Sequence, residues 1–272
     1  MLMYKNTTQN IYLITYLDSL KYSISAKQIE KSAAKTGLFK KIFIYTPQKL
    51  DQEFKKEYSN ILSEQRGGGY WIWKHQIISQ TLDLINENDL IIYTDAGSTF
   101  NYLGVKKLLE YIEQLNDSEF GNFRIEGKDE HIEEKYTSNE LLTHFNVSKN
   151  KAIKKTVQLM GGHLIFQKNT HTQDFIQSFQ NVISEDLNLI TDFYTSNQKD
   201  NFIENRHDQS IMSLISKTSG CESIPNETYF EEGSDKQYMY PFLSTRNYGH
   251  GLKDRAKYYL HFGDSYKKIK YF

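Results

Sequence analysis

Short apolar runs alternate with amphipathic stretches along the chain. The apolar runs are rich in β-branched and aromatic residues, as strands are, and they cover residues 10–16, 41–45, 90–94, 163–167 and 257–262. The stretches between them carry apolar residues at helical spacing and cover residues 25–36, 48–58, 73–85, 105–115, 173–183 and 208–216. Strands that alternate with helices predict an α/β fold with a mainly parallel central sheet and helices on both faces.

The segment at residues 121–155 interrupts this pattern. It is polar and rich in lysine, and it contains no clear strand. We interpret it as an inserted loop or a small helical subdomain near the cleft that a parallel sheet forms at the carboxyl ends of its strands, where loops often determine specificity. A solvated surface excursion fits the same composition. The length of 272 residues is compatible with one α/β domain that has a continuous core.

Composition limits the class of partner and the compartment. Lys and Arg total 33 and Asp and Glu total 34, so the net charge of -1 provides no global field for nucleic acid. Cys221 is the only cysteine, which excludes an internal disulfide framework and fits a reducing compartment. No signal-peptide pattern and no membrane-spanning apolar window is present. We expect a cytoplasmic protein, with peripheral membrane association suggested by the lysines of residues 121–155 and by Lys267, Lys268 and Lys270.

Asp95 directly follows the apolar run at residues 90–94. Ligands of parallel sheets bind beyond the carboxyl ends of the strands. Asp95 is therefore a candidate for binding a divalent cation or a sugar hydroxyl, and Gly97 would let the bound molecule approach the backbone closely. An aspartate that only closes the turn at residues 96–98 is the structural alternative.

Three glycines stand between two cations ahead of the helix predicted at residues 73–85. Residues 67–69 would expose backbone N–H groups at the positive end of the helix dipole, with Arg66 and Lys74 on either side. This combination predicts an anion site. The spacing of an ATP-binding P-loop is absent. The structural alternatives are a flexible turn for the glycines and a place in the core for the two tryptophans that follow.

Two histidine-containing stretches carry further candidate chemistry. His207, Asp208 and Gln209 open the helix predicted at residues 208–216 and bring together an imidazole, a carboxylate and an amide. Asp208 could equally be only a partner of the helix dipole. His261 ends the apolar run at residues 257–262 and is a candidate metal ligand, although a lone histidine is more often structural or exposed.

The order of these blocks resembles the GT-A type of nucleotide-sugar-dependent glycosyltransferases, particularly the bacterial enzymes that build capsules, O-antigens and lipooligosaccharides. The matching blocks are residues 69–74 (GYWIWK), 95–97 (DAG) and 207–210 (HDQS). Residues 161–166 (GGHLIF) are similar to a glycine-containing strand of glycogenin-like and galactosyltransferase-like enzymes. The resemblance spans nearly the whole chain and implies a single GT-A-like domain over residues 1–272.

The resemblance implies roles for individual residues. The end of the first strand, Thr15 and Tyr16, would hold the nucleotide base and ribose, and Arg66 and Lys74 would contact the diphosphate or the sugar. Asp208 would be the catalytic base of an inverting enzyme; in a retaining enzyme, Asp208 and Gln209 would position the donor sugar. The other donor-binding residues implied by the match are Tyr70, Trp73, Asp95, Gly97, Gly161, Gly162 and His207.

The resemblance also implies Mn²⁺ or Mg²⁺ held by Asp95 and His261. One position departs from the pattern, because the second aspartate of the D-x-D motif is Gly97 here. Metal binding would then be weaker, would use Ser98 or Asp208, or would be replaced by basic side chains that neutralise the leaving group.

The resulting hypothesis is a transferase that moves a hexose, of the galactose type, from a UDP-sugar to a saccharide or lipid-linked saccharide acceptor in bacterial surface polysaccharide synthesis. A sugar nucleotidyltransferase should have a glycine-rich loop with a basic end after the first strand, whereas residues 17–20 read LDSL. The remaining alternative is a non-catalytic carbohydrate-binding or scaffold protein with a degenerate site, which Gly97 favours.

Overall fold

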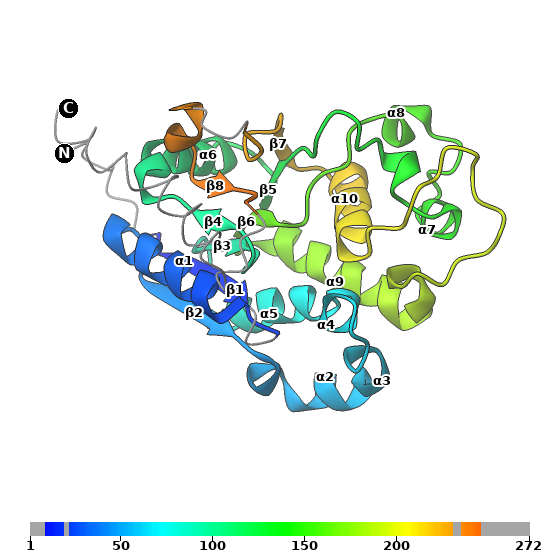
Figure 1. The fold of residues 1–272 in the computed structure, drawn as a ribbon, viewed down its shortest axis with the longest axis horizontal. Helices are drawn as coiled ribbons and strands as arrows, with labels where there is room; N and C mark the ends of the chain where they lie inside the picture. Colours follow the sequence, from blue (N-terminus) through cyan, green and yellow to red (C-terminus); the bar gives the residue numbers. More distant parts are fainter. Residues whose placement is uncertain (1–8, 19–21, 231–234, 246–272) are drawn as a thin grey trace.

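The computed structural model describes residues 9–18, 22–230 and 235–245. Its main sheet has six strands in the order β2-β1-β3-β6-β5-β7 (Figure 1). Their bounds are β1 Ile11–Tyr16, β2 Lys41–Tyr45, β3 Leu90–Thr94, β5 Asn122–Ile125, β6 His163–Gln167 and β7 Glu222–Ile224. A separate antiparallel pair consists of β4 (Thr99–Phe100) and β8 (Phe242–Leu243). Four of the five predicted strands are confirmed; the fifth, at residues 257–262, lies outside the described residues together with His261.

Helices cover both faces of the main sheet. Their bounds are α1 Ser23–Thr36, α2 Gln52–Glu57, α3 Ser59–Leu62, α4 Gly67–Tyr70, α5 Trp73–Leu82, α6 Val105–Asn116, α7 Asn139–His144, α8 Lys151–Lys154, α9 Thr170–Glu185 and α10 Asp208–Ser219. Short 3-10 helices are η2 Pro47–Lys49, η3 Tyr102–Gly104, η4 Glu133–Lys135, η5 Leu187–Ile190 and η6 Asp235–Met239. One core cluster joins α5, α9 and α10 to the sheet, and a second joins α1 and α6 to the opposite face. The predicted α/β class is confirmed.

Alternation along the central strands divides the core into these two clusters. In β1, Tyr12 and Ile14 belong to the cluster under α5, whereas Ile11 and Leu13 belong to the cluster under α1. Every residue of β1 and of β3 is buried. Such continuous apolar runs are expected of parallel strands that are covered on both sides.

One strand reverses the direction of the sheet. β6 is antiparallel to both of its neighbours, β3 and β5, while the other neighbouring pairs are parallel. Thr94 at the end of β3 is therefore opposite His163 at the start of β6. The residues that lead into β6 consequently reach the same sheet edge as the carboxyl ends of β1 and β3.

The segment at residues 121–155 differs from its prediction in one respect. It begins with β5, which lies inside the main sheet, and only the part that follows is made of loops and the short helices η4, α7 and α8. The strand was missed because Asn122 and Arg124 make it look polar. Arg124 is fully buried, and its guanidinium donates to the carbonyls of Met160 and Met212.

The helix predicted at residues 48–58 is divided in two. Leu50 is extended between η2 and α2, and the carboxylate of Asp51 accepts the N–H of Phe54 as the N-cap of α2.

Among the described helices, none combines the length and the apolar composition that crossing a bilayer requires.

Candidate active site

A cavity of about 800 Å³ opens where β1, β3 and the approach to β6 meet. Its volume is within the range of small-molecule sites. Segments that are far apart in the sequence contribute to its wall, including the ends of β1 and β3, the turn before α5, the start of α10 and parts of residues 121–155. The predicted site residues that line it are Tyr16, Arg66, Trp73, Lys74, Asp95, Gly97, Gly161, Gly162, His207, Asp208 and Gln209.

Three of these side chains form an ionic network. The Nζ of Lys74 lies 2.5 Å from Oδ2 of Asp208 and 3.6 Å from Oδ1 of Asp95. The same Nζ donates to the carbonyl of Gly161 at 2.9 Å. Lys74 and Asp208 are almost completely buried, whereas 38% of the Asp95 side chain is exposed. The convergence of residues 74, 95 and 208 that the sequence predicts is therefore present.

The surroundings of Lys74 favour a positioning role. Its ammonium has three N–H groups, and three protein oxygens surround it, so it has little capacity left for a phosphate. Burial alone would lower the pKa of Lys74, but the carboxylates of Asp208 and Asp95 outweigh burial and raise it. The lysine thus stays charged and holds the two carboxylates at a fixed separation. Its predicted contact with the diphosphate stays a prediction.

The two aspartates differ in their electrostatic state. Burial raises the pKa of Asp208 to about 6, and the ammonium of Lys74 acts in the opposite direction. Asp95 also accepts a hydrogen bond from the hydroxyl of Tyr93, a fully buried residue of β3. With one lysine between two carboxylates, the network has a net charge of about -1 when both aspartates are ionised.

Two consecutive glycines let these carboxylates approach the chain before β6. A Cβ at Gly161 would lie 3.2 Å from Oδ2 of Asp208, and one at Gly162 would lie 3.0 Å from Oδ2 of Asp95. The backbone takes part as well, because the carbonyl of Gly162 accepts the N–H of Asp95. The predicted importance of this pair is thus explained by close packing against both acids.

The glycine run forms a different structure from the predicted helix start. Five consecutive residues have positive φ and make a left-handed turn: Gly67, Gly68, Gly69, Tyr70 and Trp71. The N–H groups of Gly68, Gly69 and Tyr70 all donate to backbone carbonyls, so they are not free to bind an anion as expected. Left-handed backbone costs about 1–2 kcal/mol for each residue with a Cβ. Glycine removes this cost at three of the five positions.

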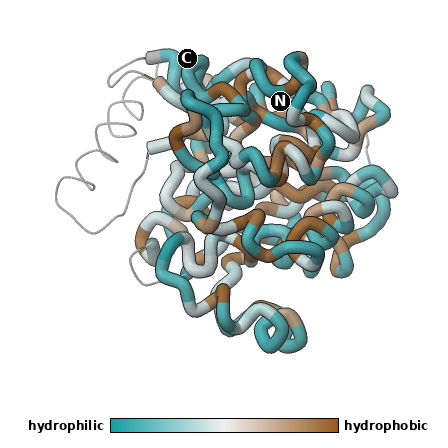
Figure 2. The backbone as a smooth tube through the Cα atoms, turned by 90° about the vertical axis from the view of Figure 1, so that its right-hand side faces the viewer, coloured by the Kyte–Doolittle hydropathy of each residue, from teal (hydrophilic) through white to brown (hydrophobic). Residues whose placement is uncertain are grey.

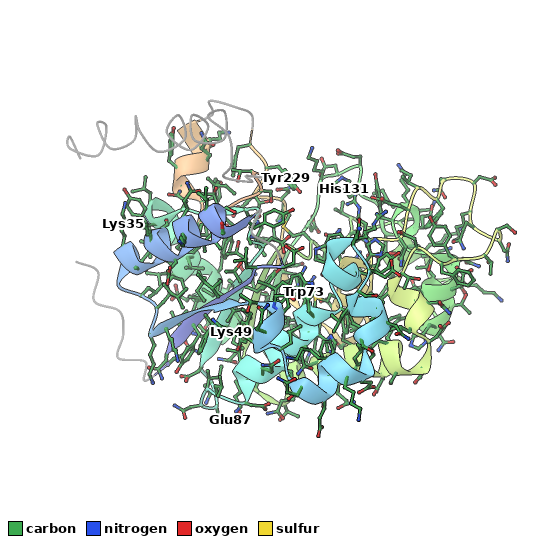
Figure 3. The ribbon with its side chains drawn as sticks, turned by 60° about the horizontal axis from the view of Figure 1, so that its bottom comes forward. Lys35, Lys49, Trp73, Glu87, His131 and Tyr229 are labelled. Atoms are coloured by element: carbon green, nitrogen blue, oxygen red, sulfur yellow. The ribbon has the colours of Figure 1, made fainter. Side chains whose placement is uncertain are left out.

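The turn also fits its aromatic neighbours. The indole of Trp71 lies so close to Gly67 that a Cβ there would be 2.4 Å from the ring. The indole of Trp73 donates from Nε1 to the carbonyl of Gly67 and stacks on Tyr16, with ring centroids 3.8 Å apart. Both tryptophans line the cavity, and so do His131 and Tyr229, which are labelled with Trp73 in Figure 3. Trp73 and Tyr16 are largely buried, in agreement with the structural alternative for one tryptophan.

Two predicted donor-binding residues do not line the cavity. Thr15 is fully buried, because its side chain alternates with that of Tyr16 and points to the other face of the sheet. Tyr70 packs its ring against His207, with centroids 5.0 Å apart. Their direct contact with a donor has no support in this arrangement.

His207 has a strained backbone at the start of α10. Its φ of 55° and ψ of -123° are rarely adopted by residues other than glycine. Its ring also stacks on Trp71, and Nδ1 donates to the carbonyl of Ile190. Burial lowers the pKa of His207, so the ring is neutral. It therefore anchors the turn that delivers Asp208 to the cavity.

Two arginines and one glutamate form a bridge along the cavity wall. Glu204 lies 3.3 Å from Nη2 of Arg66 and 3.6 Å from Nε of Arg206. Arg66 also pairs with Asp192, and the guanidinium of Arg206 lies flat on the ring of Tyr136. Arg66, Glu204 and Arg206 all line the cavity. Planar guanidinium groups in this position suit phosphate or carboxylate oxygens.

Asp18 is a candidate that sequence reasoning missed. It lines the cavity just beyond β1, and its buried Oδ1 has no hydrogen-bond partner among the residues that the structure describes. A Cβ at Gly68 would lie 3.4 Å from its Oδ2. A buried acceptor without a partner is costly and indicates that a ligand supplies the donor. Its place after a central strand, like that of Asp95, is the signal that could have identified it.

The donor set for a metal is incomplete among the described residues. No three His, Cys, Asp or Glu side chains there lie close enough to hold an ion. Asp95 provides one carboxylate, whose Oδ2 is kept uncovered by Gly162, while Asp208 is occupied by Lys74. Mg²⁺ commonly binds to one or two carboxylates together with substrate phosphates. Asp95 fits such a shared site, and the proposed ligand His261 lies outside the described residues.

No protein-family model and no curated protein sequence matches the chain. Among similar solved structures is a glycosyltransferase involved in the glycosylation of the major capsid of PBCV-1, with a TM-score of 0.50 and 10% identity over 92% of this chain and 99% of that chain. The bifunctional glycosyltransferase WbbM has a TM-score of 0.49 and 11% identity over 94% of this chain and 46% of that chain. A 2-C-methyl-D-erythritol 4-phosphate cytidylyltransferase of Francisella tularensis has a TM-score of 0.41 and 11% identity over 85% of this chain and 97% of that chain.

These likenesses concern the fold. The first structure covers nearly the whole chain, which agrees with the GT-A-like architecture predicted from the sequence. Identities near 10% leave the activity to be argued from the site itself.

Proposed function

We propose that the protein is a nucleotide-sugar-dependent glycosyltransferase. It transfers a hexose of the galactose type from a UDP-sugar to a saccharide or lipid-linked saccharide acceptor in bacterial surface polysaccharide synthesis. The observation that carries the proposal is the network of Lys74, Asp95 and Asp208 in the wall of a large cavity at the carboxyl edge of the sheet. Such edges are where α/β sheets bind nucleotides.

The end of β1 offers a place for the nucleoside. Tyr16 and Trp73 form a stacked aromatic wall there, and the unpartnered Oδ1 of Asp18 can accept a hydrogen bond from the base or the ribose. Gly67 and Gly68 line the same part of the cavity and leave room beside Asp18. The sugar would then extend toward Asp95 and the glycines before β6.

The diphosphate would lie next to Asp95. A Mg²⁺ or Mn²⁺ ion shared between Asp95 and the diphosphate would neutralise the leaving group. Arg66 and Arg206 can provide further positive charge once Glu204 gives up one of them. Lys74 keeps Asp95 in place through the same ion pair that holds Asp208.

Asp208 is the proposed base. The acceptor oxygen forms a bond to the anomeric carbon, the bond from that carbon to the diphosphate breaks, and UDP leaves with the electron pair. The proton of the acceptor hydroxyl passes to the carboxylate of Asp208. A pKa raised to about 6 suits this task near neutral pH. If the enzyme retains the configuration, Asp208 and Gln209 position the donor sugar instead.

A donor screen tests the proposed function. Purified protein is incubated with UDP-galactose, UDP-glucose and other nucleotide sugars, with and without Mn²⁺, and release of UDP is measured; slow hydrolysis without acceptor is expected for one donor. The scaffold alternative, which Gly97 favours, predicts no hydrolysis with any donor. Calorimetry with UDP and Mn²⁺ then separates a binding protein from one with no nucleotide site, and absence of binding under every metal condition would overturn the proposal.

Substitution of the proposed base tests the mechanism. Asp208→Asn keeps the shape of the side chain and removes its basicity, so turnover is expected to fall by about 10²- to 10⁴-fold. UDP binding should persist in this variant. Normal turnover by Asp208→Asn would eliminate the base role.

A further inference from the structure

The loop at residues 191–206 carries exposed apolar side chains. Phe193 is 74% exposed and Ile203 is 58% exposed. Their chain neighbours, Tyr194 and Phe202, contact each other edge to face with ring centroids 5.0 Å apart. The two exposed residues therefore flank an aromatic pair that closes the loop on itself. Large apolar side chains at this exposure often mark an interaction surface.

A group of lysines lies against the same loop. Lys154, Lys155 and Lys199 all lie within 4.0 Å of the carboxylate of Glu134. We call these three residues the lysine cluster. Lys154 is largely buried, so Lys155 and Lys199 are the members of the cluster whose ammonium groups reach solvent. The neighbouring Lys199 and burial lower the pKa of Lys154, which reflects the same crowding of positive charge.

Hydrogen bonds join the loop to Glu134, which the lysine cluster shares, and to the residue after it. The amide of Asn201 donates to Glu134, and the backbone N–H of Ile203 donates to the carbonyl of Lys135. The side of the molecule that carries α7, α8 and this loop is at the right of Figure 1 and faces the viewer in Figure 2. Hydrophobic and hydrophilic stretches lie side by side there. The exposed apolar residues and Lys199 thus belong to one loop, which contacts the segment that carries the other two lysines through Glu134.

The same loop reaches the cavity. Asp192 precedes Phe193 and Glu204 follows Ile203, and both acids pair with Arg66 in the cavity wall. A molecule bound to the loop would therefore be held beside the cavity. An acceptor carried by that bound molecule would then lie close to the cavity.

We propose that the 191–206 loop and the lysine cluster form a docking surface for an anionic phospholipid bilayer. Phe193 and Ile203 insert into the interfacial region, and the lysine cluster attracts the phosphate groups. Lys149 and Lys151, which are exposed just before and in α8, add to the positive charge. This surface is independent of the transferase chemistry, so its test does not depend on a turnover measurement.

Vesicle co-sedimentation tests the surface. The full chain is mixed with vesicles of phosphatidylcholine alone or of phosphatidylcholine with phosphatidylglycerol, and binding is expected only with the anionic lipid and to weaken with added salt. Replacing Lys155 and Lys199 with glutamine should weaken binding by about fivefold for each lysine. Replacing Phe193 with serine should weaken it by about tenfold.

Matched controls separate this surface from others. Leu84→Ser removes an equally exposed apolar side chain and Lys56→Gln removes an exposed lysine, both outside the loop and the cluster. The C-terminal lysines could also attract anionic lipid, so binding by the unmodified protein is not sufficient. Melting temperatures confirm that each variant is folded. The proposal is overturned if the unmodified protein does not bind, if it binds neutral vesicles equally well, or if the loop and cluster variants bind as the controls do.

Discussion

The carboxyl ends of β1 and β3 reach the same sheet edge and each is followed by an aspartate, yet the two acids are in different states. Asp95 has a hydroxyl donor from Tyr93 and an ammonium from Lys74 before any ligand binds. Within the described part of the chain, Asp18 has a buried carboxylate oxygen with no partner. Strand topology places both acids, and the side chains around them decide whether each charge is already compensated.

This difference predicts that one acid matters mainly for the stability of the fold and the other mainly for ligand binding. In the network around Asp95, Lys74 and Asp208 are buried and Asp95 is partly exposed, so removing the lysine leaves a buried carboxylate without its cation and lowers stability. The unpartnered oxygen of Asp18 costs free energy in the folded protein and recovers it when a donor arrives. Substitutions in the two regions should therefore have opposite signatures.

The largest effect is expected for Lys74→Met. The change leaves Asp95 and Asp208 facing each other without a cation, and the free energy of unfolding should fall by about 3–5 kcal/mol. Urea denaturation measures this. Lys56→Met, at an exposed position of α2, should change stability by no more than about 0.5 kcal/mol. Similar stabilities of the two variants would contradict the role assigned to the network.

Asp18→Ala is expected to weaken ligand binding without lowering stability. Loss of a hydrogen bond to a charged acceptor should weaken UDP binding by about tenfold to a hundredfold. Stability should be unchanged or should rise by about 1 kcal/mol, because an unpartnered buried oxygen has been removed. Calorimetry and urea denaturation give the two values, and exposed Asp83→Ala is the control. A variant that loses stability while it keeps its UDP affinity would remove the contrast between the two strand ends.

The third prediction uses pH. A base must be deprotonated, so kcat/KM should fall about tenfold for each pH unit below about 6, the pKa of Asp208. The residual activity of Asp208→Asn should lack this limb. The effect on stability has the opposite sign. Between about pH 6 and the ordinary pKa range of aspartate, the folded state binds a proton at Asp208 that the unfolded state does not bind. The free energy of unfolding therefore rises as pH falls through this window. If kcat/KM of Asp208→Asn still falls below about pH 6, the titrating group is not Asp208.

The smallest effect is expected for Gly162→Ala. The added Cβ would lie 3.0 Å from Oδ2 of Asp95, which must move by a few tenths of an ångström, at a cost of about 1 kcal/mol. Thermal or urea denaturation measures the change. In an Asp95→Ser background the cost should disappear, because the contacting oxygen is absent. Equal costs in both backgrounds would show that Asp95 is not the neighbour that matters.

The strands and most helices could be predicted because their information is local. The run at residues 90–94 is apolar up to its last residue, Thr94, and β3 has those bounds. The strand β5 was hidden because Arg124 is buried only with the help of carbonyls from β6's approach and from α10, which no local pattern reveals. The left-handed turn was also missed, because a glycine run is compatible with many backbone conformations.

The candidate site was predicted from the order of motifs and only in part. Lys74 and Asp208 are 134 residues apart, and their contact depends on α5 and α10 both packing against α9 on one face of the sheet. The sequence identified both residues and predicted that Lys74 contacts the diphosphate or the sugar, but it could not show the protein oxygens that surround the ammonium. The place of Asp18 after a central strand could have marked it, as it marked Asp95, but only the structure shows its buried oxygen and the close approach of Gly68.

The reversal of β6 has a consequence for how the charges are aligned. β6 begins at the sheet edge where its neighbour β3 ends. The carbonyl of Gly161 therefore accepts a hydrogen bond from Lys74, and the carbonyl of Gly162 accepts one from the backbone N–H of Asp95. A slip of β6 by one residue along β3 would detach both contacts together and turn its core side chains to the wrong face. The register between β3 and β6 therefore sets the positions of the charged groups. The apolar residues that fix this register also determine where Lys74 and Asp95 are held.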